Sequence, residues 1–333
     1  LNNHWGVPLS LARLPHDAGF GVFEIGMNHP GEIRPLTAFV QPHIAVVTTV
    51  DAAHLEFLGT IEAVADAKAE IFEGLVPGGS AILNRDNDQF DRLAAVAREC
   101  GAEVISFGFS ETADVRAEKI ALHPECICIA ADIRGTRTTY KIKAPGRHWA
   151  RNSLAVLATV DALGADLGLG ALALGSLTPP DGRGRRHRVA GVDGHFTVID
   201  DSYNASPASV RAGLEVLGAA DTTDGGRRIA VLGDMLELGR DADQLHEELS
   251  TDIVDNGVDG VFTCGAHMRH LFDALPAGVR AEHAETSTDL APIVSRYVGP
   301  GDIVLIKGSF ASAMARVVEK LLTVETQKRA VNG

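Results

Sequence analysis

The second half of the chain repeats one pattern, in which a short apolar run precedes a longer stretch with apolar residues at helical spacing. Such runs are typical of strands buried on both faces, and the periodic stretches are typical of amphipathic helices. Strands that alternate with helices in this way predict a mostly parallel sheet with helices on both faces. The expected strands are 196–199, 229–232, 261–264 and 303–306, and the expected helices are 209–217, 244–255 and 314–322.

The first half combines the same pattern with a different one. Residues 125–143 alternate through Ile127, Ile129 and Ile133, turn at 134–136 and then return, which predicts a β-hairpin rather than a parallel unit. The other expected strands are 21–25, 44–50 and 81–83, and the expected helices are 61–75, 89–100 and 150–163.

A segment dense in Pro, Gly and Arg, residues 178–186, separates the two halves and is typical of a linker. A chain of 333 residues is long enough for two domains, each with its own core. We therefore expect two α/β domains, 1–178 and 179–333.

Composition excludes several classes of protein. The net charge of −14 argues against nucleic acid or an anionic membrane surface as the main partner. The sequence holds no apolar run long enough to span a bilayer and no basic-then-apolar start typical of a signal peptide. The four cysteines form no CxxC pair, so we expect reduced thiols and a cytoplasmic protein that is not inserted in a membrane.

A dense group of polar residues follows the expected strand 196–199. Asp200 and Asp201 come first, then Ser202, Tyr203 and Asn204, and residues 206–207 (Ser-Pro) predict a helix start. In open α/β sheets, ligands bind beyond the carboxyl ends of strands, so we expect a nucleotide or metal site here. An ordinary turn with solvated acids is the alternative.

A lysine lies on the apolar stripe of the expected helix 61–75. Lys68 is four residues after Val64 and four before Phe72, so all three share one helix face. A lysine that points toward a core is uncommon unless it is paired, although its stem could also lie along the face while the ammonium reaches water. Glu24 and His54 are nearby candidates, but alone they would suggest a helix-capping acid and a core histidine.

Several motifs occur together with these residues in a fixed order, and the set resembles the Mur ligases. The resemblance extends over nearly the whole chain and is strongest to the branch that adds D-alanyl-D-alanine to UDP-N-acetylmuramoyl-tripeptide. It implies a central ATPase-type α/β domain that contains the hairpin, followed by a Rossmann-like C-terminal domain. The motifs are 146–152 (GRHWARN), 182–183 (GR), 200–204 (DDSYN), 233–239 (GDMLELG) and 307–309 (KGS).

The resemblance also implies a reaction and its metal. ATP phosphorylates the tripeptide carboxylate, and the amine of D-alanyl-D-alanine attacks the acyl phosphate to give the pentapeptide precursor, ADP and phosphate. Mur ligases carry a carbamylated lysine at the position of Lys68, and Glu24 and His54 match metal-binding positions, so these three residues are the expected catalytic Mg²⁺ site. Burial lowers the pKa of a lysine, a neutral amine can take up CO₂, and the carbamate is an oxygen ligand suited to Mg²⁺.

The remaining site residues follow from the same resemblance. Asn152 could otherwise be a plain helix residue and Arg183 a solvated linker arginine. Trp149 stands where the family often has Asn, and Phe310 where it commonly has Arg. The expected nucleotide-binding residues are His148, Asn152, Arg183, Asp201, Tyr203 and Asn204; the expected substrate-binding residues are Asn2, Asn3, Asn28, His29, Lys307 and Ser309.

One family feature does not occur in the chain, namely the Gly-Lys-Ser/Thr loop that holds the β- and γ-phosphates of ATP. We therefore expect a truncated, monomeric portion of such a ligase, without its N-terminal domain and P-loop and without activity on its own. The alternatives are another Mur or folylpolyglutamate-type ligase, and a non-catalytic binding paralogue. A dehydrogenase is disfavoured because no GxGxxG follows a strand of the second half.

Overall fold

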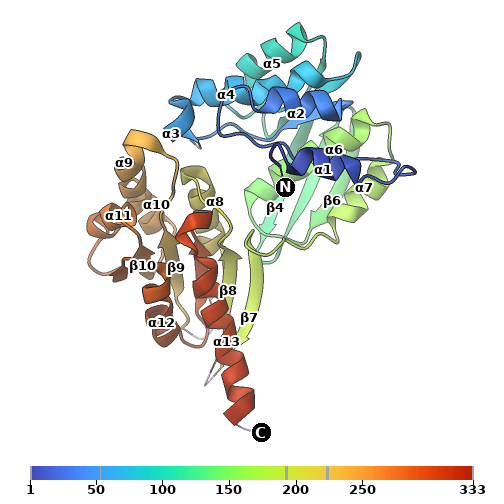
Figure 1. The fold of residues 1–333 in the computed structure, drawn as a ribbon. Helices are drawn as coiled ribbons and strands as arrows, with labels where there is room; N and C mark the ends of the chain where they lie inside the picture. The colour runs from blue at the N-terminus through green and yellow to red at the C-terminus, as the bar shows by residue number, and fades with distance from the viewer. Residues whose placement is uncertain (1, 53, 192–193, 223–224, 332–333) are drawn as a thin grey trace. The chain divides into compact units, whose positions relative to one another are not determined.

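The computed structural model describes residues 2–52, 54–191, 194–222 and 225–331, with side chains described up to residue 323. The chain divides into two compact units, each built on its own six-stranded sheet (Figure 1). The first unit comprises Leu1–Ala121, Ile127–Ile142 and His148–Ser176, and the second comprises Leu122–Cys126, Lys143–Arg147 and Leu177–Gly333. The change from one unit to the other at Ser176 lies beside the boundary expected at residue 178, but two short segments of the first half belong to the second unit.

The sheet of the first unit has the order β1-β2-β3-β4-β5-β6. The first four strands pair in parallel, and β5 and β6 form an antiparallel hairpin. The strands are β1 (Ile44–Val47), β2 (Ser80–Asn84), β3 (Glu103–Gly108), β4 (Val115–His123), β5 (Cys126–Ile133) and β6 (Thr136–Ile142). The helices are α1 (Gly6–Ala12), α2 (Ile33–Val40), α3 (Leu55–Leu58), α4 (Ile61–Ala69), η1 (Glu70–Gly74), α5 (Phe90–Glu99), α6 (Arg147–Ala162) and α7 (Leu167–Leu174).

The predicted hairpin is confirmed, since Ile127 pairs with Ile142 and Ile129 with Tyr140. The strands predicted at 44–50 and 81–83 are present as β1 and β2, whereas β3 and β4 were not predicted. The strand predicted at 21–25 is wrong, because this segment has no strand assignment and Val22 is 95% exposed. Its apolar residues suggested burial, but no described strand pairs with this segment.

The sheet of the second unit has the order β11-β10-β9-β12-β8-β7, in which all neighbours are parallel except β7 and β8. The prediction of a mostly parallel sheet is therefore confirmed. The strands are β7 (Arg185–Ala190), β8 (His195–Asp201), β9 (Arg228–Gly233), β10 (Gly260–Cys264), β11 (Arg280–Ala284) and β12 (Ile303–Lys307). The helices are α8 (Pro207–Gly218), η2 (Gly239–Asp241), α9 (Ala242–Glu247), α10 (Leu249–Asp255), α11 (Met268–Ala274), α12 (Ser287–Tyr297), η3 (Phe310–Ser312) and α13 (Ala315–Val331).

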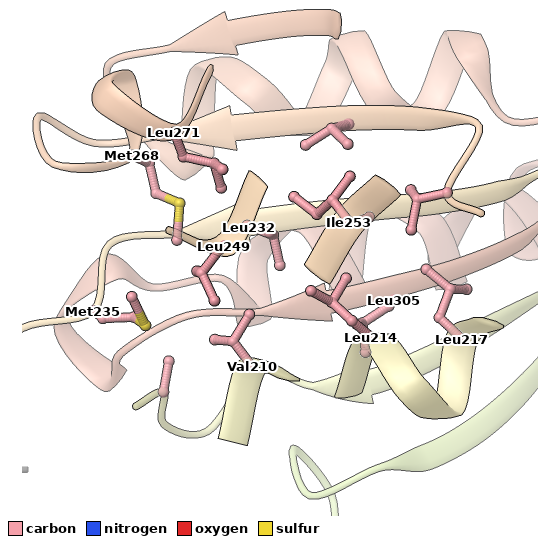
Figure 2. Close-up of a cluster of buried hydrophobic side chains, with 14 of the residues drawn as sticks. Val210, Leu214, Leu217, Leu232, Met235, Leu249, Ile253, Met268, Leu271 and Leu305 are labelled. Atoms are coloured by element: carbon pink, nitrogen blue, oxygen red, sulfur yellow. The ribbon is translucent and has the colours of Figure 1, made fainter. Parts of the chain in front are cut away.

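Helices cover both faces of this second sheet. Along β12, Ile303 and Leu305 belong to one apolar cluster, whereas Val304 and Ile306 belong to another, as the period of two along a strand requires. The first cluster packs against α8, α10 and α11 (Figure 2), and the second against α12 and α13. A central strand buried on both faces explains why 303–306 reads as an unbroken apolar run.

Two helix predictions in this unit can be compared directly. The start of α8 is confirmed, because Ser206 is its N-cap, forms a capping box with Ser209 and precedes Pro207 at N1. The helix predicted over 244–255 is divided into α9 and α10 at Glu248. Among the described residues, no helix is both long and apolar enough to cross a membrane.

Candidate functional site

A partly buried ion pair joins the carboxyl ends of β8 and β12. Asp201 and Lys307 are register partners on these parallel strands, and the Lys307 Nζ donates to Asp201 Oδ2 at 2.7 Å and to the carbonyl of Asn204 at 2.9 Å. The Lys307 side chain is only 3% exposed. The sequence predicted Asp201 and Asn204 as nucleotide-binding residues and Lys307 as a substrate-binding residue, and the structure brings all three together. Lys307 also links the 202–204 loop to the sheet.

The neighbouring acid, Asp200, has a different task. Its Oδ2 accepts a hydrogen bond from the Gly182 N–H at 2.9 Å, and its Oδ1 accepts from the Ser202 hydroxyl at 2.6 Å. Gly182 has a φ of +74°, and a Cβ there would lie 2.9 Å from the Cβ of Tyr203, so a larger residue would be strained and crowded. Asp200 therefore fixes the approach of the 182–184 turn to the end of β8.

Arg183 and Tyr203 meet at this turn and remain accessible. The Arg183 guanidinium lies over the Tyr203 ring, 4.3 Å from its centre, and the Phe310 ring centre is 5.9 Å from that of Tyr203. Tyr203 is 48% exposed and Phe310 is 75% exposed. A guanidinium beside exposed aromatic faces can contact both an anionic group and a flat ring system.

Ser309, which follows β12, is buried and hydrogen-bonds to a second loop, Gly233–Gly239, which follows β9. The Ser309 N–H donates to the Asp234 carbonyl at 2.9 Å, and the Ser309 Oγ accepts from the Leu236 N–H at 2.8 Å. The Asp234 carboxylate accepts from the Met268 N–H at 2.7 Å, at the start of α11. This loop is thus fixed on both sides by hydrogen bonds to its backbone and side chains.

Lys68 lies on α4, and its environment agrees with the helical stripe that the sequence predicted. Val64 and Phe72 on the same face are fully buried, and Lys68 is half-buried between them. Burial lowers the pKa of the Lys68 ammonium. No hydrogen bond or ion pair to this ammonium occurs within the part of the chain that the structure describes, so nothing there offsets the cost of burying its charge.

The two other expected metal ligands lie in loop regions of the same unit. Glu24 is exposed, and its Oε1 accepts a hydrogen bond from the Asn2 Nδ2 at 3.0 Å. His54 is half-buried at the start of α3 and has a left-handed backbone with φ of +60°. Over the described ranges, no three His, Cys, Asp or Glu side chains gather as a metal site. A ligand group that carbamylated Lys68 completes is a different arrangement, and it remains a prediction.

The loop that carries Asn28 and His29 is held by a carboxylate of its own. Glu32 accepts hydrogen bonds from the Asn28 N–H at 2.7 Å and the His29 N–H at 3.2 Å. These bonds, first of all the one from Asn28, lower the pKa of Glu32. The exposed side chains of Asn28 and His29 are thereby held on an ordered loop.

A second carboxylate, Glu70, supports this loop and was not predicted. Glu70 is buried, and it accepts from the Gly31 N–H at 2.6 Å and the Arg34 N–H at 3.2 Å, at the start of α2. A negative charge is favourable at a helix N-terminus, where backbone N–H groups lack partners. The only sequence signal was an acid next to the apolar residues Ile71 and Phe72, and its partners lie 36 and 39 residues away.

The remaining expected residues fall into two kinds. Asn3 has a structural role, because its Oδ1 accepts from the Trp5 and Gly6 N–H groups at 3.1 and 3.0 Å at the start of α1. His148 and Asn152 lie on α6, where His148 is half-buried and Asn152 is exposed. The amide of Asn152 is therefore accessible to a ligand on the surface of the first unit.

Two α/β units, the second with polar groups at the carboxyl ends of its parallel strands, are typical of nucleotide-binding enzymes. The model of the Mur ligase middle domain matches residues 1–160, and that of the Mur ligase, glutamate ligase domain matches residues 184–310. The chain belongs to the Mur ligase family.

Two relatives within this family carry the name UDP-N-acetylmuramoyl-tripeptide--D-alanyl-D-alanine ligase. The enzyme of Rickettsia prowazekii is 31% identical over 319 residues, which cover 96% of this chain and 70% of the relative. That of Escherichia coli is 32% identical over 326 residues, with 96% and 69% covered.

Solved structures give the same picture. MurF from Acinetobacter baumannii superposes with a TM-score of 0.86 at 28% identity, covering 96% of this chain and 68% of that one. MurF from Thermotoga maritima, solved in complex with ADP, gives a TM-score of 0.80 at 25% identity, covering 98% and 73%. The expected ATPase-type middle domain and Rossmann-like C-terminal domain are thus confirmed.

We predict that Lys307→Met lowers the free energy of unfolding by about 3 kcal/mol, because it leaves a partly buried Asp201 without its partner. Urea denaturation at neutral pH measures this change. Lys320→Met, on the exposed face of α13, is the matched control and should change stability by no more than about 0.5 kcal/mol. Equal effects of the two substitutions would contradict the role assigned to the buried pair.

Proposed function

We propose that this chain carries out the ATP-dependent ligation of D-alanyl-D-alanine to UDP-N-acetylmuramoyl-tripeptide in peptidoglycan precursor synthesis, with Mg²⁺ as cofactor. The observation that carries the proposal is the state of Lys68, a half-buried amine on an apolar helix face with a lowered pKa and no described partner. The names of the relatives supply the acceptor and donor substrates. We further propose that the protein acts as a monomer in the cytoplasm, where the precursors are made.

The chemistry of Lys68 suits carbamylation. A lowered pKa makes the neutral amine available, and this amine can attack CO₂ to form a carbamate with loss of one proton. The carbamate oxygens would join the Glu24 carboxylate and the His54 imidazole in holding Mg²⁺. Bound there, the ion would neutralise charge on the phosphoryl group in transfer.

The second unit supplies one set of proposed nucleotide contacts. Tyr203 and Arg183 present an accessible ring and guanidinium, which suit a flat or anionic part of the nucleotide. Asp201 can accept hydrogen bonds from ribose hydroxyls, and Lys307 holds both Asp201 and the Asn204 carbonyl in place. In the first unit, the exposed amide of Asn152, with His148 one helical turn before it, suits a purine edge.

Substrate contacts are proposed for two groups of residues. Asn28 and His29 are exposed on a loop that Glu32 holds. Asn2 donates a hydrogen bond to Glu24, which precedes this loop in the sequence. Asn3, Lys307 and Ser309 make internal hydrogen bonds, so we propose that they serve substrate binding by shaping their loops.

Two alternatives lead to different outcomes of one experiment. Another Mur or folylpolyglutamate-type ligase would use a different acceptor, and a non-catalytic paralogue would form no product. We would assay the protein made from the complete coding sequence with ATP, Mg²⁺ and UDP-N-acetylmuramoyl-tripeptide, and offer D-alanyl-D-alanine, single amino acids and glutamate in turn. We expect pentapeptide, ADP and phosphate in equal amounts only with D-alanyl-D-alanine.

In this assay, Lys68→Ala should lower kcat by at least about a hundredfold, because even indirect supports of a metal site contribute up to that factor. Acetate or formate should partly restore the rate, since a free carboxylate can replace the lost carbamate. Lys119→Ala, at an exposed lysine of β4, is the control and should leave both the rate and the melting temperature unchanged. Near-normal activity of folded Lys68→Ala would rule out the carbamate.

For the nucleotide contacts, we predict that Asn152→Ala and Asp201→Asn each raise the KM for ATP about tenfold, the effect of losing one good hydrogen bond. The KM for D-alanyl-D-alanine should change far less. Asp255→Asn, at an exposed acid that ends α10, provides the control. If ATP saturation is unchanged in both variants, these residues do not contact the nucleotide.

A further inference from the structure

The Gly233–Gly239 loop is the sequence motif that the proposed contacts do not explain. Two of its side chains are part of the core, since Met235 is fully buried and Leu238 is 2% exposed. Met235 packs in the cluster that also contains Met268, Leu249 and Val210 (Figure 2). Met235 and Leu238 therefore attach the loop to the hydrophobic core of the second unit.

A buried histidine on the following helix provides the polar part of this attachment. His246 on α9 is 0% exposed. Its Nε2 lies 2.9 Å from the Met235 N–H, and its Nδ1 lies 2.6 Å from the Ala242 carbonyl oxygen. A carbonyl cannot donate and an amide N–H cannot accept, so the proton must be on Nδ1 and the ring must be neutral.

The residues on either side of Met235 both bond to Ser309. The Asp234 carbonyl accepts from the Ser309 N–H, and the Leu236 N–H donates to the Ser309 Oγ. We propose that His246 is a positioning residue, which in its neutral form holds the Gly233–Gly239 loop and thereby sets Ser309 for substrate binding. The effect on substrate rests on the proposed ligase function, whereas the hold on the loop does not.

Protonation would break this arrangement. A proton on Nε2 would face the Met235 N–H, so two donors would oppose each other and the amide would lose its acceptor. The ionisable groups that face His246 are Asp234 after β9, Asp243 on α9 and His267 at the start of α11, whose ring stacks on it at 5.4 Å. The two acids favour the charged form, but burial outweighs them and lowers the pKa of His246.

The sign of the pH effect follows from this lowered pKa. The unfolded chain takes up a proton near the ordinary histidine pKa of about 6.5, whereas the folded chain does so only at lower pH. Stability due to neutral His246 is therefore fully present above about pH 6.5 and is lost as the pH falls through the folded pKa. The loop should open over the same acidic range.

We would measure this opening as the hydrogen-exchange protection factors of the Met235 and Leu236 amides in the full chain, by NMR between pH 5 and 8. In the wild type, both factors should fall about tenfold or more toward pH 5, the effect of losing one buried hydrogen bond. In His246→Gln the side-chain oxygen can still accept from Met235 but does not titrate, so protection should be independent of pH. His270→Gln, at a half-exposed histidine that pairs with Asp243, should behave as wild type.

Ser309→Ala tests the hydrogen bond between Leu236 and Ser309 without altering His246. It should remove protection from Leu236 and leave that of Met235 in place, because only Leu236 donates to the Ser309 hydroxyl. Protection of Met235 that does not change with pH in the wild type, or that falls equally in His246→Gln, would overturn the proposal.

The KM for D-alanyl-D-alanine, measured over the same pH range, tests the effect on substrate. It should rise toward pH 5 in the wild type and in His270→Gln, and stay level in His246→Gln. A wild type that forms no product while the amides respond as expected would refute the ligase function and leave the hold on the loop established. Product formation with a KM that does not follow the amides would refute the link from His246 to substrate.

Discussion

The pair formed by Lys307 and Asp201 fixes the carboxyl edge of the second sheet. An ammonium that is 3% exposed needs a charged and a polar acceptor, and it finds them in the Asp201 carboxylate and the Asn204 carbonyl. This geometry depends on the parallel register of β8 and β12, which places the two residues opposite each other. That pairing positions the 202–204 loop and with it Tyr203. The accessible side chain of Tyr203 therefore depends on the contacts of the buried Lys307.

The same arrangement recurs in other loops that carry candidate residues. Asp200 accepts from Gly182, Asp234 from Met268 and Glu70 from Gly31, so in each case a side chain satisfies backbone groups of a turn or helix start. These acids order the loops, whereas the exposed side chains on the loops are available for ligands. A polar residue beyond a strand end can therefore belong to a functional site without touching a ligand.

The sequence predicted those elements whose signals lie within one short stretch of the chain. Unbroken apolar runs identified the buried strands of the second sheet, Ser206 and Pro207 marked the start of α8, and helical spacing placed Lys68 on the face of Val64 and Phe72. The misses depend on distant partners. Arg185–Ala190 carries three arginines, and it becomes a strand because it pairs with β8; the apolar segment 21–25 does not become one. Glu70 and His246 carry no local signal for their roles, because their partners are set by tertiary contacts.

Lys68 and Lys307 represent two solutions to the same physical problem. Both place an amine away from water, which costs several kcal/mol if the charge is retained without a partner. Lys307 is stabilised by a carboxylate and a carbonyl, and such a pair has a structural role that leaves little capacity for chemistry. Lys68 has no such partner among the described residues, and burial lowers its pKa, so its neutral amine forms more readily than that of a free lysine. A neutral amine is a nucleophile, so of these two lysines it is Lys68 whose surroundings suit the carbamylation proposed above.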